Sequence, residues 1–110
     1  MSFEKAENEM LKKIVEDSKA AVREHFKALY SAVSFGAYIE PENYFVSYIF
    51  NTDKELKDAE ESGLLEEIKT FHKTKMKELG YYEEPIKECV FASMEDCQRY
   101  SKGNWYYYYH

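Results

Sequence analysis

Three histidines and two cysteines are the residues of this chain best suited to metal binding or nucleophilic catalysis. The histidines are His25, His72 and His110, and the cysteines are Cys89 and Cys97. No two histidines have the spacing of four residues that places zinc ligands on one helix face, and there is no Cys-x-x-Cys pair. A zinc site would have to combine distant residues such as His72, Cys89 and Cys97, so we predict no bound metal.

The sequence gives equally little support for a catalytic site. Either cysteine could form a thiolate–imidazole pair with His72, but neither lies in a local signature of a cysteine nucleophile. Adjacent glutamates occur at 60–61, 66–67 and 83–84. Acid–base catalysis needs two carboxylates in a cleft, whereas adjacent glutamates on a helix usually form a solvated face. The four glycines form no phosphate-binding loop. We therefore expect no enzymatic activity and no cofactor.

Length and charge restrict the class of protein further. A chain of 110 residues is expected to form one domain, spanning 1–110. The net charge of −6 argues against nucleic-acid binding, which requires a basic surface. The first ten residues contain no apolar signal region, and no run is long enough to cross a membrane. These features predict a cytoplasmic protein with two free thiols.

The segment Thr52–Gly80 has the clearest structural pattern. Thr52 and Glu55 have the spacing of a capping box, and Gly80 suits the left-handed position that follows a helix. Gly63 predicts a bend or a split in the middle. The apolar side chains recur every three or four residues, as on one face of a helix: Leu56, Leu64, Leu65, Ile68, Phe71, Met76 and Leu79.

The N-terminal part predicts a helix followed by a β-hairpin. An apolar stripe without Gly or Pro predicts a long helix from Ser2 to about Ala32. Segments 34–39 and 44–51 are rich in apolar and aromatic residues, and the turn residues at 40–43 separate them. Both faces of the second segment are apolar, so this strand is expected to be central in its sheet.

The C-terminal part predicts two more strands. Segment 86–92 is β-like, Ser93 begins a short capped helix, and Lys102–Asn104 turns the chain. Trp105–Tyr109 is predicted as a final strand. The order is α-β-β-α-β-α-β, and we predict an α+β fold with an antiparallel sheet of about four strands packed on two main helices.

Aromatic content is the most unusual feature of the composition. The chain is 17% aromatic and has 11 tyrosines. Tyrosine combines an apolar ring with a polar hydroxyl and is enriched at protein interfaces, and carboxylates nearby would steer a basic partner. The predicted partner-binding residues are Tyr44, Tyr48, Glu60, Glu61, Trp105, Tyr107 and Tyr109.

The chain also resembles a group of known proteins over Tyr44–His110. An aromatic strand that leads into NTDKEL, an acidic helix containing ESGLLEEIK and a C-terminal GNWYYYY are similar to segments of small bacterial immunity proteins. The resemblance implies a cytoplasmic, acidic, non-enzymatic protein that binds and neutralises a toxin, often a basic nuclease. Contact residues vary among such proteins, so none is transferred by position.

Two other classes of function remain open from the sequence. Trp105 and Tyr107 could line an aromatic pocket with His72 and a carboxylate, as in a small-molecule-binding or enzymatic domain. Alternatively, the chain could form a homodimer or a larger homo-oligomer through its long N-terminal helix or through an edge strand at Trp105–Tyr109.

Overall fold

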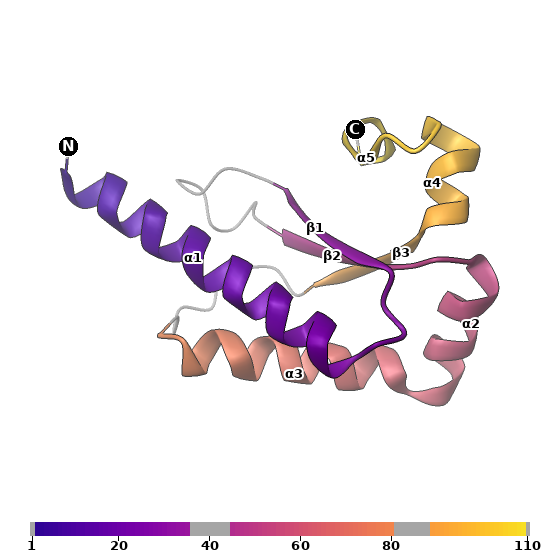
Figure 1. The fold of residues 1–110 in the computed structure, drawn as a ribbon, viewed down its shortest axis with the longest axis horizontal. Helices are drawn as coiled ribbons and strands as arrows, with labels where there is room; N and C mark the ends of the chain where they lie inside the picture. Colours follow the sequence, from indigo (N-terminus) through magenta and orange to yellow (C-terminus); the bar gives the residue numbers. More distant parts are fainter. Residues whose placement is uncertain (1, 36–44, 81–88, 110) are drawn as a thin grey trace.

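The structure, a computed structural model, describes residues 2–35, 45–80 and 89–109. In this part of the chain a three-stranded sheet lies between helices (Figure 1). The elements in chain order are α1 (Ser2–His25), β1 (Ser31–Phe35), β2 (Phe45–Phe50), α2 (Asp53–Ser62), α3 (Leu64–Glu78), β3 (Val90–Ser93), α4 (Met94–Ser101) and α5 (Trp105–Tyr108).

The sheet has the order β1-β2-β3, so β2 is central, as its two apolar faces predict. β1 and β2 are antiparallel and β3 is parallel to β2. The predicted α+β class is confirmed, and β1 and β2 are antiparallel as predicted. The prediction of an antiparallel sheet of about four strands is wrong, because the described sheet has three strands and β3 is parallel to β2. The predicted order of elements is wrong as well, because the long helix is divided into α2 and α3 and the C-terminal segment is helical. The helices α2 and α3 carry the chain back along the sheet, which lets β3 enter in the direction of β2. The predicted hairpin turn at 40–43 lies outside the described residues, as do 86–88 of the predicted third strand.

The predicted C-terminal strand is a short helix, α5. Lys102 and Gly103 both have positive φ, of 54° and 85°, and turn the chain after α4. The amides of Tyr108 and Tyr109 then donate to the carbonyls of Asn104 and Trp105 at 3.0 and 3.2 Å, which is helical spacing. Every residue in this segment is aromatic, so its apparent alternation carried no information about strand or helix.

The first helix is shorter than predicted. α1 ends at His25, not near Ala32. Ser31 begins β1 and pairs with Ile49 of β2, and the amide of Tyr30 also donates to the carbonyl of Ile49 at 2.7 Å. Pairing with β2 ends the helix, although no Gly or Pro marks its end.

The predicted N-caps at Thr52 and Ser93 are confirmed, but within the described structure the reciprocal bond of a capping box, from the Thr52 amide to the Glu55 carboxylate, is not formed. Thr52 Oγ1 accepts from the Glu55 amide at 3.1 Å, and Ser93 Oγ accepts from the Asp96 amide at 3.0 Å. Gly63 splits the long helix into α2 and α3, because its φ of 85° is left-handed. Gly80 is left-handed too, with φ 108°.

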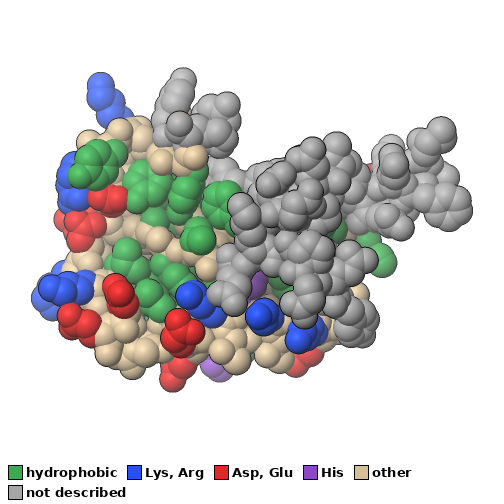
Figure 2. Space-filling view, turned by 180° about the vertical axis from the view of Figure 1, so that it is seen from behind, with side chains coloured by type: hydrophobic (Ala, Val, Ile, Leu, Met, Phe, Trp, Pro, Cys, Tyr) green, Lys and Arg blue, Asp and Glu red, His purple; other side chains and the backbone are tan. Residues whose placement is uncertain are grey.

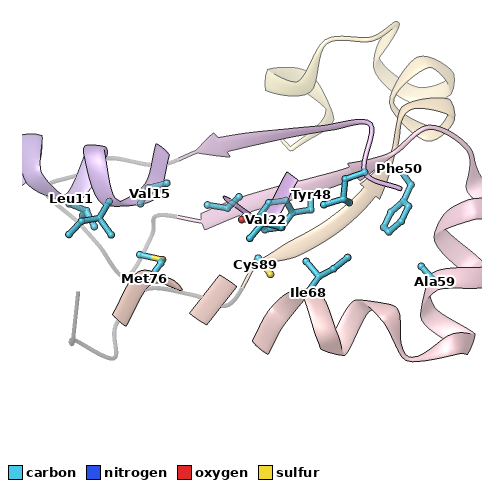
Figure 3. Packing of buried hydrophobic residues seen from close by; sticks show 12 residues of the cluster. Leu11, Val15, Val22, Tyr48, Phe50, Ala59, Ile68, Met76 and Cys89 are labelled. Carbon is cyan, nitrogen blue, oxygen red and sulfur yellow. The ribbon is translucent and has the colours of Figure 1, made fainter. Parts of the chain in front are cut away.

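The main core lies between the sheet and the pair α1 and α3. Tyr48 and Phe50 of β2 point from the sheet toward Val22 of α1 and Ile68 of α3 (Figure 3). Residues 45, 47 and 49 of β2 face the opposite side, where α4 and α5 lie (Figure 1). Ile49 is fully buried there. None of the described helices combines the length and the apolar character needed to cross a membrane.

Candidate functional site

His72 lies inside the core and is bonded to Tyr48. The Tyr48 hydroxyl is 2.7 Å from His72 Nδ1, and the two rings meet edge to face at 5.5 Å. Burial lowers the pKa of His72 to about 4, and burial, followed by the nearby Cys89, raises the pKa of Tyr48. Both groups are therefore neutral at pH 7. Because Tyr48 is fully buried and His72 nearly so, the pair has no contact with solvent at which a substrate could react.

The two cysteines are separated by the sheet. Cys89 is buried in the main core near Tyr48 (Figure 3). Cys97 is fully buried on α4, with its sulfur 3.2 Å from the Ser101 hydroxyl. Among the described residues no three His, Cys, Asp or Glu side chains are grouped as metal ligands. The distant zinc set His72, Cys89 and Cys97 is therefore not brought together.

The C-terminal aromatic residues cover the other face of the sheet. The Tyr109 hydroxyl lies 2.5 Å from Ser47 Oγ, and its ring packs edge to face on Phe45 at 5.3 Å. Trp105 stacks on Tyr109 at 6.1 Å. Ser47 points away from the face that holds Tyr48 and His72. Trp105 and His72 thus lie on opposite faces of the sheet and do not share a pocket.

A polar junction joins the helices that follow β2 and β3. Because these strands are parallel and adjacent, α2 and α4 begin side by side. The Ser93 hydroxyl donates to the Asp53 carboxylate, and the Asp53 amide donates to Glu95 Oε1 at 2.7 Å. The Glu95 amide in turn donates to the carbonyl of Asn51 at 3.2 Å. These bonds fix α4 against α2.

Arg99 and Tyr108 complete the polar junction. Arg99 donates to Asp53 at 2.5 Å and to Asp96 at 2.8 Å, while the Tyr108 hydroxyl donates to Asp96. The hydrogen bond from Ser93 and then that from Arg99 hold the pKa of Asp53 below its usual value. Burial, followed by the bond to Asp96, raises the pKa of Tyr108. Each of these groups has a partner inside the junction, so the junction positions α2 and α4 and is not itself a binding site.

This arrangement concentrates negative charge at one end of the molecule. α2 and α4 together carry seven carboxylates and three basic side chains, a net −4 of the total −6. α1 has six acidic and five basic residues, and α3 has three acidic and four basic residues, so both are nearly neutral. We call the surface formed by α2 (Asp53–Ser62) and α4 (Met94–Ser101) the acidic end.

No family model, curated protein or solved structure matches the chain.

The charge of the acidic end can be assigned to particular residues. Glu60 and Glu61 are exposed on the last turn of α2, and neither makes an ion pair with a described residue. Asp58, by contrast, is paired with Lys54 at 3.0 Å. The two glutamates therefore present uncompensated charge.

The structure places the predicted partner-binding residues in different environments. Glu60 and Glu61 are exposed at the acidic end, whereas Tyr48 is fully buried and cannot touch a partner of the folded chain. Trp105 and Tyr109 are half-buried in the aromatic cluster on the sheet. Tyr44 and the side chain of Tyr107 lie outside the described part of the structure.

Two exposed apolar side chains near the acidic end were not predicted. Tyr100 on α4 is 74% exposed and lies against the Arg99 guanidinium, 5.8 Å from ring centroid to cation. Val90 at the start of β3 is 38% exposed. Nothing in the sequence distinguished Tyr100 from the ten other tyrosines, because its exposure depends on how α4 docks.

Proposed function

We propose that this chain is a non-enzymatic protein-binding module, an immunity protein that binds a basic toxin in the cytoplasm and blocks its active site. The observation that carries the proposal is the acidic end, where two short helices hold two thirds of the net charge. A field of one sign on one surface accelerates association with an oppositely charged protein and orients the encounter.

The acidic end also offers an anchor for affinity. Tyr100 is 74% exposed on α4, and tyrosine is enriched at the energetic hot spots of interfaces. The polar junction favours a rigid surface, because it fixes α4 on α2 before a partner arrives. A rigid surface loses less conformational entropy on binding than a mobile one.

The experiment is a protection and binding assay with the protein encoded beside this chain as the candidate toxin. The candidate is expressed alone and together with the chain, and growth is measured. Complex formation is then measured by calorimetry at increasing salt. The proposal expects toxicity alone, rescue by the chain, and affinity that falls as salt rises.

Charge-reversal variants test the surface. Glu60→Lys combined with Glu61→Lys should weaken binding by tenfold or more, about 1.4 kcal/mol, and reduce the rescue. The matched control is Glu9→Lys combined with Glu24→Lys, which reverses two exposed glutamates on α1 with the same change in net charge. Equal loss in both variants would show that only total charge matters and would contradict the acidic end as the binding surface.

A further inference from the structure

Tyr100 of α4 is more exposed than any other large hydrophobic side chain that the structure describes. Its ring lies against the Arg99 guanidinium, at 5.8 Å from ring centroid to cation. An aromatic ring attracts cations to both of its faces. Arg99 takes one face, and the high exposure of the side chain leaves the other face open to a cation from another molecule.

A carboxylate lies beside this ring. Asp96 and Tyr100 are four residues apart on α4, so their side chains are neighbours on the helix surface. The Asp96 carboxylate accepts from Arg99 at one oxygen and from the Tyr108 hydroxyl at the other. Each carboxylate oxygen has two lone pairs, and the Asp96 side chain is partly exposed. Asp96 therefore keeps acceptor capacity toward solvent next to the open ring face.

The charge around Tyr100 favours a cation. The polar junction contains three carboxylates, on Asp53, Glu95 and Asp96, and one guanidinium, on Arg99, which leaves a net −2. Arg99 is balanced by the two carboxylates that it contacts, so it does not exclude a second cation. The junction alone is not a binding site, but Tyr100 lies next to it and adds an unoccupied ring face.

Both parts of this surface are held in place before a partner arrives. Tyr108, which bonds to the Asp96 carboxylate, packs edge to face on Trp105 at 5.1 Å. Arg99 fixes the same carboxylate from the other side at 2.8 Å. Figure 2 shows hydrophobic side chains, a class that includes tyrosine, gathered on the half of this face that carries α2 and α4, with charged side chains around them. A prearranged site loses little conformational entropy on binding.

We propose that an arginine of the partner protein binds on α4, with its guanidinium stacked on the open face of Tyr100 and hydrogen-bonded to the Asp96 carboxylate. This proposal rests on the proposed function and names the side chain by which the partner is recognised. A guanidinium is planar, stacks on aromatic rings and presents several N–H groups to a carboxylate, whereas the lysine ammonium is a strongly hydrated point charge. The site therefore favours arginine over lysine.

The test uses isotope-labelled full-length chain and three synthetic peptides of equal length, in which arginine, lysine or citrulline alternates with glycine. Citrulline has nearly the shape of arginine but no charge. We expect the arginine peptide to shift the amide signals around Tyr100 and to give nuclear Overhauser contacts between arginine protons and the Tyr100 ring. The lysine peptide should bind about twofold or more weaker, and the citrulline peptide about tenfold or more weaker. Equal binding of the arginine and lysine peptides would overturn the proposal.

Two tyrosine variants test the ring. Tyr100→Leu keeps an apolar side chain but removes the ring, so it should weaken the arginine peptide by about two- to fivefold and abolish its advantage over lysine. The matched control is Tyr30→Leu, which removes another exposed tyrosine, just before β1. Only the backbone carbonyl of Tyr30 accepts from Arg23, so this contact survives the substitution. Tyr30→Leu should leave both affinities unchanged, and equal loss in the two variants would contradict the site.

Two aspartate variants test the carboxylate. Asp96→Asn should weaken the arginine peptide by about fivefold or more. Asp58→Asn removes the same charge from α2, away from Tyr100, and should weaken it by about twofold or less. Equal weakening would mean that only total charge matters, and it would overturn the proposal. Thermal unfolding verifies that all variants fold, and the tyrosine pair decides the question if Asp96→Asn does not.

The outcomes separate this inference from the proposed function. If a toxin binds through Glu60 and Glu61 and Tyr100→Leu does not weaken the complex, the proposed function stands and the arginine site is wrong. If the arginine peptide binds at Tyr100 with the expected preference but no toxin is neutralised, the proposed function fails alone. Signal shifts confined to residues outside α4 and α5 would also overturn the inference.

Discussion

Tyr48 and His72 join the central strand to α3 inside the core, with the tyrosine hydroxyl 2.7 Å from Nδ1 of the imidazole. Both side chains are shielded from water, so each polar atom depends on the other for a hydrogen bond. The pair therefore stabilises the packing of α3 on the sheet and is not a catalytic dyad. Its removal should affect stability and leave binding at the surface unchanged.

The first prediction concerns the hydroxyl of this pair. Tyr48→Phe keeps the ring in place but leaves Nδ1 of His72 without its partner. A buried polar atom that loses its partner destabilises a protein by about 1–3 kcal/mol. Urea unfolding should show a loss of this size. Affinity for a partner should be unchanged, and a tenfold loss of affinity at unchanged fold would contradict the structural role assigned to Tyr48.

The second prediction is a pH dependence that originates at His72. Its pKa is about 4 in the folded chain against 6.5 as the ordinary value, so the unfolded chain binds the proton more tightly. Stability should therefore be highest above pH 6.5 and should fall as the pH drops from 6.5 to about 4. The shift corresponds to a loss of about 3 kcal/mol at most.

His72→Gln checks the origin of this slope, because glutamine does not titrate. Unfolding free energies are measured by urea between pH 7 and pH 5, above the range in which most carboxylates titrate. The variant should lose most of the slope even if it is less stable overall. Asp53 acts in a different window: its pKa is lowered, so its contribution is lost only as the pH falls below the ordinary carboxyl value of 3.8. An unchanged slope in the variant would assign the pH dependence to other groups.

The third prediction compares the two helix caps. Ser93 is fully buried, and its hydroxyl accepts from the Asp96 amide and donates to Asp53. Thr52 is half-buried, and within the described structure its side chain makes only the capping bond to the Glu55 amide. Loss of a helix cap typically destabilises by about 1 kcal/mol, with a range of about 0.5–2. Ser93→Ala should therefore destabilise the chain more than Thr52→Ala in the same unfolding assay. The reverse order would mean that the polar junction does not stabilise α4 on α2.

The sequence predicted those features that depend on neighbours along the chain. The caps at Thr52 and Ser93, the break at Gly63 and the central position of β2 follow from local residue types. The exposure of Glu60 and Glu61 follows from the apolar stripe of their helix. These features need no knowledge of distant contacts.

Features that depend on distant contacts were missed. The parallel direction of β3 depends on where α3 returns the chain, and the end of α1 depends on the pairing of Ser31 with Ile49. Tyr48 was predicted as a partner contact because the chain is rich in tyrosine, but only packing decides which face of β2 meets α1 and α3. The acidic end forms because α2 and α4 follow adjacent parallel strands, which the predicted antiparallel sheet did not bring together.

The last prediction contrasts two buried serines. Ser18 on α1 and Ser47 on β2 are both fully buried. Ser47 Oγ lies 2.5 Å from the Tyr109 hydroxyl, whereas Ser18 Oγ has no hydrogen-bond partner among the described residues. A buried hydroxyl without a partner is unfavourable, so Ser18→Ala should leave stability unchanged or raise it by about 1 kcal/mol.

Ser47→Ala should have the opposite effect. It leaves the Tyr109 hydroxyl without this bond and should lower the free energy of unfolding by about 1 kcal/mol or more. The two variants remove the same atom from equally buried sites, so the difference between them isolates the hydrogen bond from the change in side-chain volume. If Ser18→Ala were the more destabilising variant, Ser18 would have to bond inside the core, for example through a buried water molecule.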